Sequence, residues 1–100
     1  MYRASVRQAV REVEEALLTL HSTGARRADV AAAAEGFARS LQAVQTRYDR
    51  GLASLMELED ARRQALAARS AELALELERW RAWVALYRAS GGGFNPSATS

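Results

Sequence analysis

Three acidic residues stand close together near the middle of the chain, at Glu57, Glu59 and Asp60. Carboxylates at such spacing can hold a divalent cation when further oxygen ligands join them. Glu57 and Asp60 would share one face of a helix, so several copies of the chain around a symmetry axis would form an acidic ring. Capping and the helix dipole explain the same charges in a single copy, which therefore predicts no metal site.

Other reactive residue types are scarce. His21 is the single histidine, it has no acid close by in sequence, and cysteine is absent. The absence of cysteine excludes a disulfide, a thiolate metal site and a cysteine nucleophile. Because no set of nucleophile, base and oxyanion donors can be assembled, the sequence predicts a protein that is not an enzyme and uses no cofactor.

The charges also limit the partners. The chain contains fourteen basic residues, all arginine, and twelve acidic residues, so the formal net charge is +2. This balance does not predict a nucleic-acid surface. No apolar run approaches the length of about 18 residues that a membrane helix needs, and the first residues do not resemble a signal peptide. We expect no nucleic-acid binding and no membrane span in this chain.

The elements that position these residues are predicted to be helices. Hydrophobic residues make up 49% of a chain that is rich in alanine, leucine, glutamate and arginine and holds one proline. This composition is typical of an all-α helical hairpin or coiled coil. A first helix over about 3–50 carries apolar or small residues at heptad spacing, at Val6, Val10, Val13, Leu17, Leu20, Gly24, Ala31, Ala34, Phe37 or Ala38, Leu41, Val44 and Tyr48. The polar segment 21–25 could break this helix and give three helices.

A turn at about 51–53 separates this helix from a second one over about 54–90. Gly51 favours the left-handed conformation that ends a helix, and Arg47 and Arg50 in the last turn oppose the negative end of the dipole. Ser54 and Glu57 form a Ser-x-x-Glu capping box that starts the next helix. So short a link between long helices favours antiparallel packing.

The second helix is apolar on more than one face, because Leu73, Leu75 and Leu77 step by two residues. A hairpin cannot bury two faces of one helix, so further helices are expected beside it. After this helix comes a glycine triplet at 91–93. Since no strand precedes it and no helix follows, it predicts a C-cap and a flexible Gly/Ser-rich tail over 91–100, not a phosphate site.

Three stretches in this order resemble the TolC-type outer-membrane efflux proteins, the exit ducts of tripartite pumps. The stretch 10–17 is similar to the family's helix pattern A-x-x-E-V-E-x-A-L, and 85–94 is similar to its pattern A-L-Y-K-A-L-G-G-G-W. The turn resembles the family's repeat signature through Tyr48-x-x-Gly51-x-x-Ser54-x-x-Glu57-Leu58-x-Asp60-Ala61-x-Arg63. The chain departs from the family at Glu59, Ser90 and Phe94, where an apolar residue, leucine and tryptophan respectively are usual.

The resemblance implies the last coiled-coil hairpin of a longer protomer in the outer membrane and periplasm. Three sister protomers would form a homotrimer that meets a periplasmic adaptor and an inner-membrane pump in multidrug export. The implied tip residues for gating and adaptor contact are Tyr48, Gly51, Ser54, Glu57, Asp60 and Arg63. Glu57 and Asp60 would border the lumen and favour cations.

Other hypotheses stay open at this point. The strands of a membrane barrel and a second repeat are missing from the sequence, so the chain is interpreted as a fragment of a duct. Spare apolar faces would equally suit a self-associating helical interaction module without a transport role. A third hypothesis is the coiled-coil hairpin of the adaptor, which lipoyl-like strand segments beside the helices would support.

Overall fold

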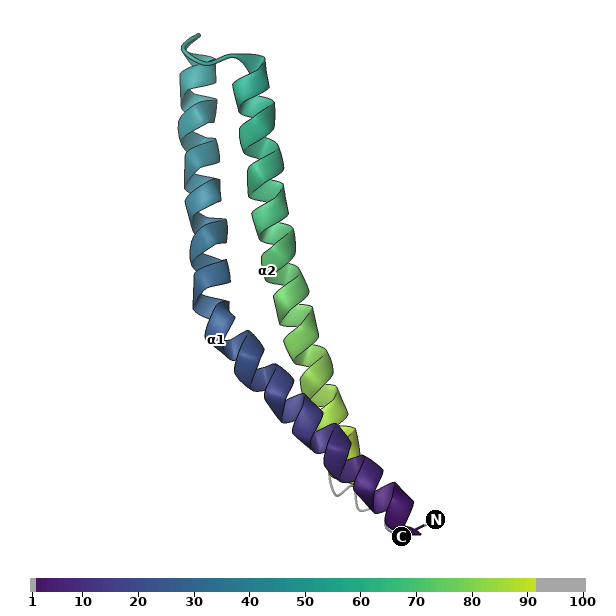
Figure 1. Ribbon diagram of the computed structural model, residues 1–100. Coiled ribbons are helices and arrows are strands. Elements are labelled where there is room, and N and C mark those ends of the chain that lie inside the picture. Colours follow the sequence, from purple (N-terminus) through teal and green to yellow (C-terminus); the bar gives the residue numbers. More distant parts are fainter. Residues whose placement is uncertain (1, 92–100) are drawn as a thin grey trace. The chain divides into compact units, whose positions relative to one another are not determined.

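The computed structural model describes residues 2–91, and these form a helical hairpin. Helix α1 covers Tyr2–Asp49, helix α2 covers Leu55–Ala89, and a turn over 50–54 joins them (Figure 1). Within 2–91 no residue belongs to a strand. The predicted all-α hairpin is therefore confirmed. The flexible tail was predicted for 91–100, of which 92–100 lie outside the described residues.

Helix α1 continues through the polar segment 21–25, so the alternative with three helices is not realised. The hydroxyl groups of this segment bond back to the helix itself. Thr23 donates from Oγ1 to the carbonyl oxygen of Thr19 at 2.6 Å, and Ser22 donates to the same carbonyl at 3.3 Å. Such back-bonding satisfies a hydroxyl without ending the helix.

The hairpin divides into two compact units, each with a stretch of both helices. The turn unit comprises 26–75, and the terminal unit comprises 1–25 together with 76–100. In the turn unit the buried apolar residues are Ala34, Leu58, Ala61 and Leu75. In the described part of the terminal unit the buried residues are Ala16, Thr23 and Ala82. Both cores are thus narrow seams made largely of alanine.

One face of α2 is buried or half-buried in each of the two units. The buried or half-buried positions there alternate by three and four residues, at Leu58, Ala61, Ala65, Ala68, Glu72, Leu75, Arg79, Ala82, Leu86 and Ala89. This alternation is the heptad spacing of a coiled coil. Two of these seam positions are charged, Glu72 and Arg79, and they are one heptad apart.

The seam of α1 differs from the predicted one in its first half. Val6, Val10 and Leu17 were expected to face the partner helix, but about half of each side chain is exposed. Ala16 and Thr23 are buried in their place, with 5% and 0% of their surface exposed. The prediction favoured the larger residues of two stripes that both follow heptad spacing. In the structure the stripe of smaller residues, which includes Ala16 and Thr23, is the buried one.

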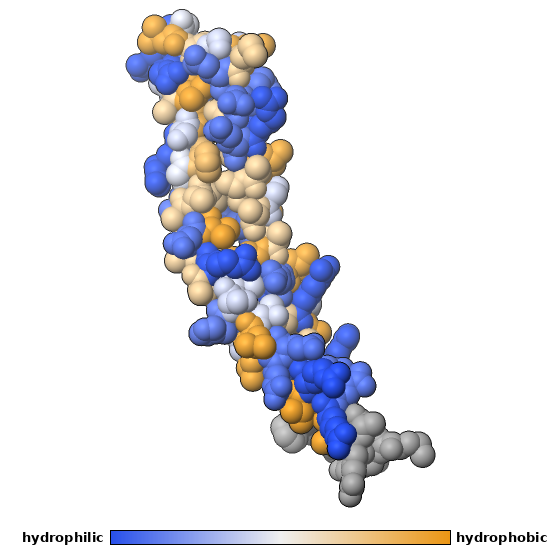
Figure 2. Space-filling model, in the orientation of Figure 1, coloured by the Kyte–Doolittle hydropathy of each residue, from blue (hydrophilic) through white to orange (hydrophobic). Residues whose placement is uncertain are grey.

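A second face of α2 remains apolar and exposed, as the sequence predicted. Its large exposed side chains are Leu66, Leu73, Leu77, Trp80, Trp83 and Tyr87. Figure 2 shows hydrophobic patches interleaved with hydrophilic residues on the face in view. Nowhere in 2–91 does a helix combine the length and apolarity needed to cross a bilayer.

Candidate functional site

The turn begins where α1 ends in a Schellman motif centred on Gly51. The glycine has a φ of 75°, which lies in the left-handed region that residues with a Cβ rarely adopt. The N–H of Gly51 donates to the carbonyl of Tyr48 at 2.9 Å, and the N–H of Leu52 donates to the carbonyl of Arg47 at 2.7 Å. These two bonds satisfy carbonyl groups that the end of the helix would leave free.

Ser54 starts α2 as its N-cap. Its hydroxyl oxygen accepts a hydrogen bond from the N–H of Glu57 at 3.1 Å, and its carbonyl accepts one from the N–H of Leu58 at 3.1 Å. The first bond is the Ser-to-Glu half of the predicted capping box. The carboxylate of Glu57 was expected to return to Ser54, but it accepts a hydrogen bond from Arg47.

Arg47 and Glu57 therefore link the two helices across the turn. Nη2 of Arg47 lies 2.9 Å from Oε2 of Glu57, and about half of each side chain is exposed. Arg47 lies at the negative end of α1 and Glu57 at the positive end of α2, so each charge also complements its own helix. Sequence reasoning placed Arg47 only as a helix-ending residue. Its opposite charge to Glu57 across a predicted reversal was the signal for this pair.

The other two acids of the cluster are paired with arginines on the same helix. Glu59 accepts from Arg62 at 2.8 Å, and Asp60 accepts from Arg63 at 3.0 Å. Arg62 also reaches α1, where it donates to the side-chain oxygen of Gln45 at 3.4 Å. Each carboxylate is thus engaged by a guanidinium. Among the described residues no group of three or more His, Asp or Glu side chains could hold a metal ion.

The structure brings the six predicted tip residues together only in part. Gly51, Ser54 and Glu57 build the turn itself, whereas Asp60 and Arg63 form their own pair further along α2. Tyr48 lies in the last turn of α1 with 37% of its surface exposed. The prediction missed three exposed apolar side chains beside them, Leu52, Leu55 and Met56.

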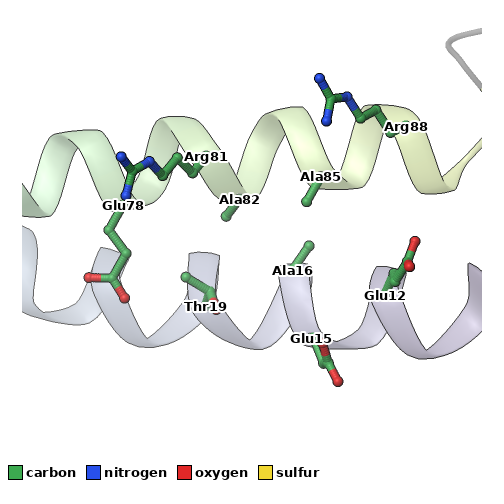
Figure 3. A pocket seen from close by; sticks show the side chains of 9 residues that line it. All are labelled: Glu12, Glu15, Ala16, Thr19, Glu78, Arg81, Ala82, Ala85 and Arg88. Atoms are coloured by element: carbon green, nitrogen blue, oxygen red, sulfur yellow. The ribbon is translucent and has the colours of Figure 1, made fainter.

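A shallow groove in the terminal unit is a second candidate. It measures about 560 Å³, and Figure 3 shows small side chains at its floor, among them Ala16 and Ala85, which point toward one another from α1 and α2. Its edges carry three acids, Glu12, Glu15 and Glu78, and two arginines, Arg81 and Arg88. This mixed lining contains neither histidine nor a serine or cysteine nucleophile.

The fold and the turn define a long antiparallel helical hairpin with a firmly capped reversal. Comparison with protein families identifies the family to which this hairpin belongs. Residues 1–92 match the model of the outer membrane efflux protein family, so the chain belongs to that family. No curated protein and no solved structure matches the chain. The predicted kinship with TolC-type efflux proteins is confirmed, and it favours a component of an efflux duct over an adaptor hairpin and over an enzyme.

Proposed function

We propose that the chain is the periplasmic tip hairpin of an outer-membrane efflux duct. In this proposal it contributes two helices to a helical barrel of sister protomers, and its turn docks on the periplasmic adaptor of the pump. The family match over 1–92 supports the duct. The second apolar face of α2 supports the barrel, because a helix in a barrel has neighbours on two sides.

The observation that carries the adaptor contact is a set of exposed apolar side chains on a well-capped turn. Leu52, Leu55 and Met56 are exposed by 70%, 57% and 83% of their surfaces. The Schellman motif and the Ser54 cap hold the backbone beneath them in one conformation, so little backbone conformational freedom is lost on binding. Exposed apolar residues on a pre-ordered element are typical of a docking site.

Gating and cation preference form the second part of the proposal. Tyr48 is available for contacts between neighbouring tips that close the duct, and Glu57 and Asp60 border the lumen. Arginines neutralise both carboxylates within one copy, through Arg47 and Arg63. An acidic lumen therefore requires that these half-exposed pairs loosen when protomers assemble, which the small net strength of surface ion pairs permits.

The experiment uses the efflux protein that carries this hairpin, in cells that hold its pump and adaptor. A photo-crosslinking residue at Met56 should capture the adaptor, whereas the same residue at Leu66, exposed to 67% on the same helix, should not. With the photo-crosslinking residue at Met56, Leu55→Asp should abolish capture, and in the otherwise natural protein it should raise drug susceptibility. Normal export and adaptor capture in Leu55→Asp would contradict the docking surface.

Gating needs a separate readout. Tyr48→Ala and Asp60→Ala should change drug susceptibility or single-channel conductance, and Asp60→Ala should reduce the preference for cations. Arg39→Ala is the matched control, because Arg39 is an exposed charged residue in the same unit and pairs only weakly with Glu35, at 3.9 Å. Unchanged conductance and susceptibility in both tip variants would contradict the gating role.

A second candidate function is self-association without transport, which the exposed stripe of Leu73, Leu77 and Trp80 favours. Apolar stripes of this kind drive helix pairing in water. Sedimentation of the 100-residue chain distinguishes the two. A folded dimer of fixed stoichiometry would favour the interaction module, and a monomer or an open series of aggregates would favour the duct.

A further inference from the structure

Arg79 occupies a position in the seam between the helices that is normally apolar. It stands between Leu75 and Ala82, which are exposed by only 4% and 6%, and it continues the three-four alternation of the α2 seam. Its side chain is half-buried within the terminal unit. A guanidinium in such a place is costly unless its donors find acceptors.

The acceptors come from α1. Nη1 of Arg79 donates to the carbonyl oxygen of Leu20 at 2.9 Å and to Oγ1 of Thr23 at 3.1 Å. The same Thr23 hydroxyl donates its own proton to the carbonyl of Thr19 at 2.6 Å. The Thr23 hydroxyl thus accepts a hydrogen bond from Arg79 and donates one to the backbone of α1. The side chain of Thr23 is fully buried. Bonds with a charged donor are stronger than neutral ones.

Gly24 provides the space for this contact. A Cβ atom added at Gly24 would lie 3.0 Å from Nη1 of Arg79, closer than an ordinary van der Waals contact. Glycine inside a helix costs about 1 kcal/mol relative to alanine, so the position is unfavourable for α1 alone. The advantage of glycine here is that it leaves room for the Arg79 side chain of α2. Leu20, Thr23, Gly24 and Arg79 are called the Arg79 clasp below.

We propose that the Arg79 clasp is a register lock, which fixes how far α2 is shifted along α1. The α2 seam by itself specifies register weakly, because apart from Glu72 and Arg79 it consists of alanine and leucine, which make no directional bonds that a shift of one heptad would break. The clasp does not tolerate that shift. It would move Arg79 from Thr23 and Gly24 to Ala16 and Leu17, or to Val30 and Ala31, which offer neither a hydroxyl nor the open space. A single polar seam residue sets alignment in this way in coiled coils.

This device goes beyond the proposed function and does not depend on it, because it concerns the pairing of the helices within one chain. It also makes a definite structural claim. The clasp selects one alignment by directional bonds, whereas the alanines around it only allow close approach. Losing the clasp should therefore change the alignment more than it changes the helix content.

Disulfide trapping in the 100-residue chain tests the lock, since the natural chain contains no cysteine. The pair Ala16→Cys with Ala85→Cys reports the observed register, because these side chains face one another in the groove (Figure 3). The pair Ala16→Cys with Glu78→Cys reports a slip of one heptad. The measured quantity is the ratio of the two intramolecular cross-links in dilute solution under oxidation, with helix content followed by circular dichroism.

Arg79→Met should lower that ratio by about tenfold or more, since it removes two hydrogen bonds from a charged donor. Arg81→Met is the matched control, because Arg81 is an exposed arginine on the same helix, and it should leave the ratio unchanged. An unchanged ratio in Arg79→Met would overturn the lock. Equal loss of both cross-links together with the helix signal would also overturn it, because Arg79 would then be needed for folding and not for alignment.

Gly24→Ala separates register from folding. Alanine favours the helix, so the helix signal should be retained or increased. The added Cβ crowds Nη1 of Arg79, so the ratio of cross-links should nevertheless fall, by less than in Arg79→Met. A retained ratio in Gly24→Ala would show that the space above Gly24 plays no part and would overturn that element of the lock.

Discussion

The two most deeply buried large side chains of the described hairpin lie in different units and differ in kind. Leu58, exposed by 1%, lies in the turn unit, and Thr23, exposed by 0%, lies in the terminal unit. Leu58 contributes by removing apolar surface from water, which has no preferred direction. Thr23 contributes through hydrogen bonds, which are directional. The most buried side chain of the turn unit is thus apolar, and that of the terminal unit makes a directional polar contact.

The turn unit also has a second source of order that the terminal unit lacks among its described residues. The link between its helices is five residues long and is tied by the Schellman motif and the Ser54 cap. A short closed loop restricts the shifts that two helices can make. Register in the turn unit thus follows from chain connectivity. In the terminal unit, far along the sequence from the turn, the proposed lock adds a specific contact.

The largest expected effect tests the burial of Leu58 in the turn unit. Leu58→Ala should lower the free energy of unfolding by about 2–5 kcal/mol, because it leaves a cavity at a fully buried position. Leu66→Ala, the control on the exposed face, should change it by less than about 0.5 kcal/mol. Urea denaturation followed by circular dichroism measures both. Similar losses in the two variants would mean that the seam is not the dominant core of the turn unit.

The second-largest expected effect tests the hydrogen bond between Arg79 and Thr23. Thr23→Val keeps the shape of the side chain but removes the acceptor for Arg79, and it should cost about 1–2 kcal/mol in the free energy of unfolding. Thr23→Ser keeps the hydroxyl and should cost less. The loss in Thr23→Val should largely disappear in an Arg79→Met background, because the donor is then absent as well. Full additivity of the two substitutions would contradict the clasp.

The sequence was sufficient for the hairpin but not for the alignment of its helices. Gly51 with Ser54 and Glu57 predicted the reversal because caps are local features whose partners lie within a few residues. The seam of α1 was ambiguous, because two adjacent stripes share Val13 and Leu20 and both follow heptad spacing. Arg79 contacts the packed stripe at Thr23, from which it is 56 residues away in the sequence. A contact of that separation leaves no local pattern.

The candidate site at the turn could likewise be predicted only in its local features. Its backbone could be predicted from glycine and serine chemistry, and the charges of the acidic cluster were evident from their spacing. The pairing of Glu57 with Arg47, and not with its own N-cap, depends on where α1 ends relative to α2 in space. The exposed apolar group at Leu52, Leu55 and Met56 has no sequence signal of its own, since exposure cannot be deduced before the neighbours are known.

A smaller effect compares two glycines of different kinds. Gly51→Ala should cost about 1 kcal/mol or slightly more, because alanine is strained at a φ of 75°. Gly36→Ala should instead stabilise the chain by up to about 1 kcal/mol, since Gly36 lies inside α1 and a Cβ there would meet nothing within 4 Å. Thermal unfolding of the two variants measures the opposite signs. A stabilising Gly51→Ala would contradict the capped turn.

The smallest effect concerns the ion pair across the turn. Arg47→Gln and Glu57→Gln should each cost less than about 1 kcal/mol, because half-exposed pairs are well solvated. In about 1 M salt the Debye length is roughly 3 Å, so most of the difference from the natural chain should vanish. Exchanging the charges, Arg47→Glu with Glu57→Arg, restores the attraction but reverses both interactions with the helix dipoles. The exchanged chain should therefore be more stable than either single reversal and less stable than the natural chain, as urea denaturation at low salt can measure. Full recovery would mean that the dipoles contribute nothing and that the attraction between the two side chains accounts for the whole effect.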